Sequence, residues 1–376
     1  MPLSRRKLIA GAGATTLALV GGVGLWRVTR MPRTAANPWM LDQTPPADVR
    51  LDAFRHAILA PNPHNRQPWL IRLEGSDGAI ISCDLNRRLP ETDPFDRQIT
   101  IGFGTFLEIA RITAAQRGVR MEITPFPDGE PQPNLDARPV ARLRFAPDAT
   151  IQRDPLFAAI TKRRTTREPF DLARAVPDSL ARQISDGTYT TDPQRIATIR
   201  AISMAGIKTE QMIPRTNMES VRLMRFGHDQ VDANPDGISL TGPMMEALKL
   251  AGQLDQNALG DPTSSSFKTG IDMMQEVYGS VPAAVWITTP GNGRLDQLEA
   301  GRRHVRANLR ATALGVAMHP LSQSLQEYDE VAELFRRVHI ILGAKEGERV
   351  QMLVRIGYAP QAEAAPRWPL ETHLRT

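Results

Sequence analysis

Two polar clusters in this chain contain the residue types that could bind a flat polar ligand and an anion. The first is the run Ala60–Trp69, with the sequence APNPHNRQPW. Its three prolines stiffen the backbone and remove N–H donors. The side chains of Asn62, His64, Asn65 and Gln67 could then be held toward the edge of a heterocycle. A helix-to-strand turn capped by asparagine is the alternative interpretation of the same run.

The second cluster is the basic stretch Arg163–Arg167, with the sequence RRTTR. It follows a short helix that the pair Asp154-Pro155 is well suited to begin. In an extended chain, Arg163, Thr165 and Arg167 lie on one side, where two guanidinium groups and a hydroxyl could hold one phosphate. A solvated basic helix end is the alternative interpretation.

Composition excludes several other classes of function. The net charge is +5 over 376 residues and aromatic content is 5%, whereas a nucleic-acid site would interleave a basic stripe with aromatic residues. The single cysteine, Cys83, cannot form an internal disulfide, and the seven histidines lack the spacing of a metal site. We therefore expect no nucleic-acid partner and no metal.

The N-terminus is predicted to be a targeting segment. Ser4-Arg5-Arg6-Lys7 precedes an uncharged stretch, Leu8–Trp26, rich in Gly, Ala and Leu. This pattern is typical of a twin-arginine export signal, which engages the twin-arginine export machinery and carries folded proteins to the periplasm. We assign residues 1–36 to this signal. An uncleaved inner-membrane anchor is the alternative, because the stretch is nearly long enough to span a bilayer.

Periodicity and turn residues predict an alternation of helices and strands. In the first half we expect helices over Leu51–Leu59 and Thr105–Gln116, strands over Trp69–Leu73, Ala79–Leu85 and Val119–Thr124, and a proline-rich connector between two halves over Pro125–Pro139. In the second half we expect helices over Leu172–Thr191, Arg195–Lys208, Gly301–Met318 and Glu327–Leu342, and strands over Pro282–Thr289 and Val350–Tyr358.

Two further patterns bear on the architecture. The segment Gly118–Met121, with the sequence GVRM, resembles Gly315–Met318, with the sequence GVAM, and each follows a predicted long helix. This repeat suggests two related halves. Gly102-Phe103-Gly104 offers a competing dinucleotide fingerprint, but Leu107 stands where a third small residue is required.

Together the two clusters resemble the nitroreductase superfamily of FMN-dependent oxidoreductases. Arg163, Thr165 and Arg167 match the family's Arg-x-Ser-x-Arg phosphate motif, with Thr for Ser. The run Pro61–Trp69 matches its Pro-Ser-x-x-Asn-x-Gln-Pro-Trp flavin-ring loop, with Asn62 for Ser.

Weaker matches extend the resemblance to the end of the chain. Arg367 matches an arginine near the phosphate, and Gly357–Pro360 resembles the closing strand. Leu321, Ser322 and Gln323 stand where the family's backbone faces flavin N5. The resemblance thus implies an FMN site formed by Asn62, Pro63, His64, Asn65, Gln67, Arg163, Thr165, Arg167, Leu321, Ser322, Gln323 and Arg367.

The order of the motifs differs from that of ordinary members, in which the phosphate motif comes first. Here the ring loop lies in a first half, residues 37–150, and the phosphate motif in a second half, residues 151–376. This order implies the Acg-like branch, a monomer with one FMN site. Its fold would be α+β and nitroreductase-like, with two degenerate halves forming an intramolecular pseudo-dimer, each a mainly antiparallel sheet packed by helices. Residues 228–272 are expected to form a lid, with Met244, Met245 and Leu248 facing inward.

The resemblance leaves three functions open. The first is an exported FMN oxidoreductase that reduces a small quinone-like or nitroaromatic-like acceptor through flavin N5, without a nucleophilic or basic side chain. The second is a flavin-sequestering or storage protein with a lidded site and little NAD(P)H-dependent turnover. The third is a periplasmic binding protein without flavin.

Overall fold

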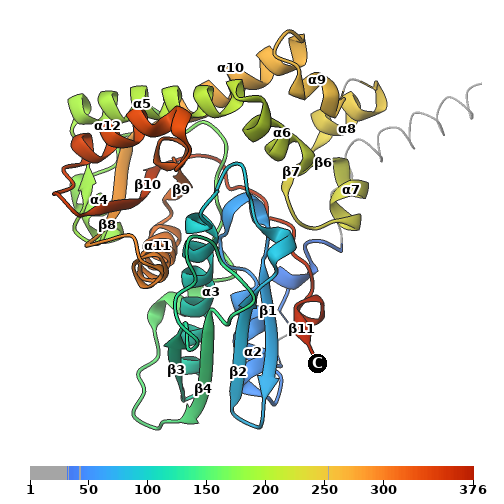
Figure 1. Ribbon diagram of the computed structural model, residues 1–376, viewed down its shortest axis with the longest axis vertical. Helices are drawn as coiled ribbons and strands as arrows, with labels where there is room; N and C mark the ends of the chain where they lie inside the picture. The colour runs from blue at the N-terminus through green and yellow to red at the C-terminus, as the bar shows by residue number, and fades with distance from the viewer. Residues whose placement is uncertain (1–31, 33, 42–43, 253) are drawn as a thin grey trace, which may run out of the picture.

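A computed structural model describes residues 32, 34–41, 44–252 and 254–376. Residues 1–31 and 33 of the predicted export signal lie outside these residues, whereas residues 32 and 34–36 are described. Two larger β-sheets stand at the two ends of the molecule, and helices fill the space between and around them (Figure 1). A third sheet pairs two short parallel strands, β6 (Met224–Phe226) and β7 (Ile238–Leu240). Within the described ranges, no helix is both long and apolar enough to cross a bilayer.

The first sheet has the strand order β11-β1-β2-β4-β3 and is antiparallel except where β11 pairs with β1. Its strands are β1 (Trp69–Glu74), β2 (Gly78–Cys83), β3 (Val119–Pro125), β4 (Ala141–Pro147) and β11 (Leu374–Arg375). The helices α2 (Val49–Ala57) and α3 (Arg97–Gln116) cover one face. There Trp69 stacks on Phe106 with ring centroids 4.9 Å apart.

The predicted connector between the halves is wrong. Residues 126–140 join β3 to β4, and these two strands pair along their whole length, from Val119 with Pro147 to Pro125 with Ala141. The proline-rich segment is therefore a loop within the first sheet. Its prolines keep the connecting residues from continuing either of the two paired strands. The number of prolines alone therefore does not mark a domain boundary.

The second sheet is antiparallel throughout, in the order β5-β8-β10-β9. Its strands are β5 (Tyr189–Thr190), β8 (Ala283–Thr289), β9 (Ala317–Pro320) and β10 (Arg349–Gly357). The remaining helices are α4 (Asp178–Ile184), α5 (Pro193–Met212), α6 (Pro214–Arg222), α7 (Gly227–Ala233), α8 (Pro243–Leu250), α9 (Gln256–Gly260), α10 (Ser265–Gly279), α11 (Arg294–Ala313) and α12 (Ala332–Leu342). Helices cover both faces of this sheet, which explains why β10 is almost entirely buried.

The helix predicted over Leu172–Thr191 is much shorter in the structure. Pro177 occupies the N-cap of α4, and the helix ends at Ile184. Gly187 has a φ of 99°, a conformation that a helix cannot contain. The chain then enters β5, so apolar periodicity alone overestimated this helix.

The helices α3 and α11 cross in the middle of the molecule (Figure 1), and glycines let their backbones touch at the crossing point. A Cβ on Gly104 would lie 2.1 Å from the carbonyl oxygen of Leu298. Reciprocally, a Cβ on Gly301 would lie 2.0 Å from the carbonyl oxygen of Ile101. Gly104 therefore serves helix packing. Because Gly102-Phe103-Gly104 lies inside α3, the dinucleotide fingerprint is excluded.

The crossing belongs to a repeat longer than the one visible in the sequence. The pairs Arg97 and Arg294, Gly104 and Gly301, Gly118 and Gly315, and Met121 and Met318 are all equally spaced along the chain. In each half the long helix leads into a strand, β3 or β9, and the orders β2-β4-β3 and β8-β10-β9 correspond. The α+β class is confirmed, with two halves that each hold a mainly antiparallel sheet packed by helices.

The first residue of α3 and the first residue of α11 are arginines that bind the opposite half. Arg97 donates to the carbonyl oxygens of Leu325, at 2.7 Å, and Gln351, at 2.8 Å, and pairs with Glu327 at 3.1 Å. Arg294 donates to the carbonyl oxygens of Phe95, Pro131 and Pro133, at 2.9, 3.0 and 2.7 Å. These reciprocal contacts join the halves.

The C-terminal tail returns from the second half to the first. After β10 the chain passes α2 and adds β11 in parallel to β1, with Ile71 opposite Leu374. This path places Arg367 beside the predicted ring loop. The C-terminal tail and the predicted ring loop, which are far apart in the sequence, therefore meet at one place.

Candidate functional site

The predicted ring loop is a rigid turn that holds several residues in strained conformations. His64, Asn65 and Gln67 have φ values of 44°, 52° and 50°, in the left-handed region that asparagine tolerates better than most residues. The side chain of Asn62 braces the loop from within, because its Oδ1 accepts from the backbone N–H of Gln67 at 2.7 Å. The side chain of Asn62 does not cap the short helix Pro63–Asn65 that follows it, so the brace spans the loop instead. Strain of this kind is typical of functional sites.

The loop packs on α3 through a small residue. A Cβ on Gly102 would lie 3.3 Å from Asn62 and 3.4 Å from Pro63, so a larger residue would push the loop outward. The hydroxyl of Thr105 donates to the carbonyl oxygen of Pro61 at 2.7 Å. The central helix thus fixes the position of the loop.

The phosphate-type arginines converge on the C-terminal end of α2. Arg163 donates to the carbonyl oxygen of Leu59 at 3.0 Å. Arg367 donates to the carbonyl oxygens of Ile58, at 2.8 Å, and Ala60, at 3.1 Å. The carbonyl end of a helix attracts cations, which accounts for this meeting.

Asn65 ties the arginine group to the ring loop. Its Oδ1 accepts from Nη1 of Arg367, and its Nδ2 donates to the carbonyl oxygen of Pro366 at 2.9 Å. Gln67 accepts from the backbone N–H of Trp368 at 2.9 Å. The structure therefore brings together the loop, the start of the basic cluster and the C-terminal arginine, as the sequence predicted.

No carboxylate balances the arginines at this point. Arg163 and Arg367 are each 2% exposed, and among the described residues neither they nor Arg164 forms an ion pair. Burial and the charge of Arg164 lower the pKa of Arg163 to about 9, and burial with Arg163 and Arg164 holds the pKa of Arg367 well below its usual value. In the described ranges, the Nε of Arg163 has no hydrogen-bond partner. A buried positive group without countercharge suits an anionic ligand.

The N-terminal segment covers these arginines with Trp39. The guanidinium carbons of Arg163, Arg164 and Arg367 lie 5.6, 4.6 and 5.5 Å from the centre of its ring. The indole donates to the carbonyl oxygen of Ala365 at 2.7 Å. The backbone N–H of Arg367 donates to the carbonyl oxygen of Ala35 at 2.9 Å. Sequence reasoning missed this tryptophan.

The second half of the basic cluster points elsewhere. Thr165 stays with Arg163 and accepts from its Nη1 at 3.3 Å. Arg167 donates to the carbonyl oxygen of Ser239 at 2.8 Å and lies near His64 and His319, whose pKa values its charge helps to lower. Arg163 and Arg367 both donate to the carbonyl oxygen of Leu59. The structure therefore separates Arg167 from this shared acceptor.

The first part of the predicted lid lies directly on the ring loop. Gln67 donates to the carbonyl oxygen of Pro235 at 2.7 Å, and the N–H of Gly237 donates to the carbonyl oxygen of Asn65 at 3.3 Å. Asp236 pairs with Arg66 at 2.9 Å. Residues 235–239 thus cover the predicted ring loop.

The expectation for the lid's methionines is wrong in part. Met244 is 59% exposed, whereas Glu246 of the same helix is buried against His228, with Oε1 2.7 Å from Nδ1. The N–H of His228 also donates to this oxygen, at 2.6 Å. A buried polar contact therefore orients α8, and the apolar pattern does not.

The opposite wall comes from the segment after β9. Leu321 is buried and its N–H donates to the carbonyl oxygen of Leu353 at 2.8 Å. Gln323 follows Ser322 and lies between Glu210 of α5 and Tyr278 of α10, and its side chain bonds to both. Tyr278 also feels the charge of Arg167, so this wall adjoins the ring-loop side.

His64 faces this interior as a neutral ring. Burial, Arg66 and Arg167 lower its pKa to about 4, and its Nδ1 is buried without a partner among the described residues. His64 Nδ1, Arg163 Nε and Gln323 Oε1 are thus partnerless polar atoms contributed by three of the predicted segments. Such atoms fit a polar ligand with an anionic end.

Sequence reasoning missed Glu210 and Tyr278. Ile196, Ile199, Ser203 and Gly206 precede Glu210 at helical spacing on the buried face of α5. A carboxylate at the end of an otherwise buried stripe was a signal that could have identified it.

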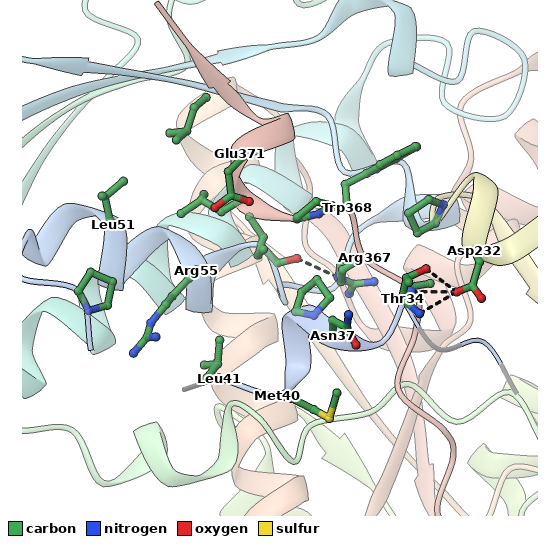
Figure 2. Close-up of a pocket in the computed structure, with 18 residues that line it drawn as sticks. Thr34, Asn37, Met40, Leu41, Leu51, Arg55, Asp232, Arg367, Trp368 and Glu371 are labelled. Carbon is green, nitrogen blue, oxygen red and sulfur yellow. Dashed lines mark hydrogen bonds between the residues drawn. The ribbon is translucent and has the colours of Figure 1, made fainter. Parts of the chain in front are cut away.

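A pocket of about 650 Å³ opens beside Arg367, on the side of the N-terminal and C-terminal segments (Figure 2). Of the predicted site residues it includes Arg367 alone. Its walls carry apolar residues, among them Leu41, Leu51 and Leu370. This pocket is not the predicted ring site.

Comparison with known proteins supports a relationship along nearly the whole folded chain. "Putative NAD(P)H nitroreductase acg" of Mycobacterium tuberculosis is 28% identical over 344 residues, which cover 88% of this chain and 97% of that protein. A second protein of that organism, Rv3131, carries the same nitroreductase description and is 26% identical over 334 residues, or 86% and 90% of the two chains. No protein-family model matches the chain.

Solved structures give a weaker likeness. The FMN-dependent nitroreductase NfnB of Mycobacterium smegmatis, in complex with NADPH, is 17% identical and superposes with a TM-score of 0.34 over 58% of this chain and 96% of its own. A nitroreductase with bound FMN from Desulfitobacterium hafniense is 15% identical, with a TM-score of 0.33 over 60% and 99% of the two chains. We draw no argument from superpositions at this level. The full-length sequence relatives, together with the two-halved α+β architecture, support the nitroreductase-like fold.

Proposed function

We propose that this protein is an FMN-dependent oxidoreductase of the nitroreductase superfamily with a single flavin site. The observation that carries the proposal is the convergence of the Asn62–Gln67 loop, Arg163 and Arg367 around three buried or half-buried guanidinium groups without a carboxylate. A ligand that carries an anionic group and a polar ring fits both the guanidinium groups and the loop. The sequence relatives, named as nitroreductases, support the same conclusion.

The residues divide into two groups by what they would hold. Arg163, Thr165 and Arg367 would bind the phosphate, through charge-assisted hydrogen bonds worth roughly 1.5–3 kcal/mol each. His64, Asn65 and Gln67 would surround the ring on one side, and Leu321–Gln323 on the other. FMN supplies two-electron chemistry at N5 when bound. The protein binds, orients and shields it.

Arg167 would act between the two groups. It lies near His64 and is fixed by the carbonyl oxygen of Ser239, so its charge faces the ring side of the site. A positive charge there would favour a ring that gains electron density. Residues 235–239, bonded to the loop, would exclude water.

The N-terminal pattern adds a location to the proposal. A twin-arginine signal in residues 1–36 would place the folded protein in the periplasm, either released or held at the inner membrane. A fusion of residues 1–36 to a reporter that works only after folded export tests this. Replacing Arg5 and Arg6 by lysine should abolish export, and unchanged export would refute the signal.

The visible spectrum of the purified protein tests the flavin site. We expect FMN to co-purify, or to be taken up by the apoprotein, with bands that differ from those of free FMN. No flavin band and no FMN uptake would reject the proposal and favour a binding protein for another ligand. The expected acceptor is a small quinone-like or nitroaromatic-like molecule, whose reduction would restore the oxidised spectrum.

The lid supports a second candidate function, a flavin-sequestering protein. Pro235, Asp236, Gly237 and Ser239 are all bonded to the loop or to Arg167, so the ring side is covered in the described conformation. NAD(P)H, which is named for the mycobacterial relatives, separates the candidates. Bleaching followed by turnover with a quinone indicates an oxidoreductase, whereas a persistently oxidised spectrum indicates storage.

A further inference from the structure

A cluster of buried oxygen atoms without partners lies beside the proposed ring site, between α5 and the turn that follows β9. Glu210 and Ser203 are 4% and 2% exposed and belong to α5, and Ser324 is fully buried in the turn. Within the part of the chain that the structure describes, Glu210 Oε2, Ser203 Oγ, Ser324 Oγ and Gln323 Oε1 have no hydrogen-bond partner.

Close backbone packing places these oxygens on facing surfaces. A Cβ on Gly206 would lie 2.8 Å from the backbone nitrogen of Ser324 and 3.3 Å from Cβ of Gln323. Ser203 is one helical turn before Gly206 and Glu210 one turn after it, so all three share the face toward the turn. A buried water needs two to four polar partners, and this cluster supplies them.

Among the described residues, no basic side chain is paired with the carboxyl group of Glu210. No ion pair is formed by it within the described residues, and its hydrogen-bond partners are the amides of Gln323 and Gln326. The ionisable groups that face it are Tyr278 of α10, Tyr328 and Glu219 of α6. None of them is a cation, so burial favours the neutral carboxyl.

We propose that Glu210 is the buried proton donor of this site and that a water held by the partnerless oxygens carries its proton toward the acceptor beside Gln323. The inference rests on the proposed function. Reduction of a quinone-like acceptor to the hydroquinone takes two electrons and two protons. The electron pair and one proton arrive as hydride from reduced FMN. The O–H bond of Glu210 breaks and supplies the second proton, which leaves a carboxylate that is reprotonated from solvent.

The neighbouring groups are unsuited to this task at neutral pH. Burial holds the pKa of His319 well below and that of Tyr278 well above their ordinary values, and the pKa of His64 is about 4. Burial, with Glu219 adding to it, raises the pKa of Glu210 to about 7. A proton donor works best when its pKa lies near the working pH.

Infrared difference spectroscopy of the protein without added acceptor gives a test independent of turnover. The wild type should show the band of a protonated carboxyl that disappears around pH 7, and Glu210→Gln should lack it. Glu219→Gln should keep the band but move its loss to lower pH, because a negative charge that opposes ionisation is removed. A wild-type spectrum without such a titrating band would overturn the inference.

Kinetics of the photoreduced, FMN-loaded protein with benzoquinone provide the second arm. The rate in the wild type should fall as pH rises through 7, and Glu210→Gln should be about 100-fold slower and independent of pH in that range. FMN affinity should be the same in both proteins. If the wild type binds FMN and Glu210→Gln reoxidises at the wild-type rate, the inference is wrong and the proposed function stands. If the wild type binds no FMN, both the inference and the proposed function are wrong.

Discussion

Two pairs of buried arginines in this molecule differ in their surroundings. Arg97 begins α3 and Arg294 begins α11, and each binds the opposite half through several carbonyl oxygens. Acidic groups lie near both, Glu327 beside Arg97 and Asp93 and Asp96 near Arg294. Arg163 and Arg367 are just as buried, but the charges that act on them are other arginines.

This difference separates arginines that complete a fold from arginines that await a ligand. Burying a cation is costly unless nearby groups compensate it. For the first set the protein supplies the compensation itself. For the second it supplies carbonyl oxygens and the face of Trp39 but no negative charge. Removing an arginine should therefore have opposite consequences in the two sets.

The largest effect is expected from Arg294→Met. The carbonyl oxygens of Phe95, Pro131 and Pro133 would lose their donor, and we expect the free energy of unfolding to fall by about 4 kcal/mol. Urea unfolding measures this. FMN affinity of the protein that remains folded should not change. A stability loss below about 1 kcal/mol would show that the joint between the halves does not depend on this arginine.

Arg163→Met should have the reverse effect, with little change in stability and a loss of FMN affinity. It removes one hydrogen bond to Leu59 together with an uncompensated buried charge, so the stability of the apoprotein should change by less than about 1 kcal/mol. FMN affinity should fall roughly thirtyfold, equivalent to about 2 kcal/mol. Fluorescence titration with FMN measures the loss, with Arg153→Met, an exposed arginine outside the cluster, as the control. Strong destabilisation without loss of affinity would remove the distinction between the two sets.

Trp39→Leu sharpens the comparison by keeping an apolar side chain while removing the aromatic face. The three guanidinium groups would lose a cation–π partner, and we expect about 1.5 kcal/mol less stability of the apoprotein. Trp368→Leu is the matched control, because its ring lies 5.7 Å from Arg87, which has an acidic partner in Asp84. If both substitutions cost the same, the covering of the arginines by Trp39 has no special role.

The smallest effect concerns the pH dependence of stability. The pKa of His64 is about 4 in the folded protein and about 6.5 when unfolded. Between these values the unfolded chain binds the proton, so stability is full above pH 6.5 and falls as the pH drops toward 4. His64→Asn tolerates the positive φ and should reduce the loss between pH 7.5 and 5.7 by about 1 kcal/mol. Unfolding at the two pH values measures it, and an unchanged loss would show that His64 is solvated.

The sequence predicted which residues lie together better than it predicted the connections around them. Asn65, Gln67, Arg163 and Arg367 could be identified because short polar motifs between prolines or beside aromatic residues are uncommon. The mistaken connector over Pro125–Pro139 shows the limit, since a proline-rich loop within a sheet and one between domains have the same composition.

Other features could not be predicted because they depend on tertiary contact. Trp39 lies near Arg163 only because the C-terminal tail folds back and holds the N-terminal segment. The meeting of Glu210 with Gln323 depends on the packing of α5 at Gly206. The role of Gly104 became clear only when Gly301 was seen to face it.

The glycine crossing also governs the order in which the molecule can be completed during synthesis. Four strands of the first sheet, β1 to β4, and α3 leave the ribosome early, but the face of α3 that meets Gly301 has no partner until α11 has been made. Arg367 and β11 follow later still, in the last residues of the chain. Long-range contacts of this kind slow folding and expose apolar surface to aggregation. The nascent chain therefore has no finished binding site until translation ends, and a truncated product would lack the arginine and the strand that close it.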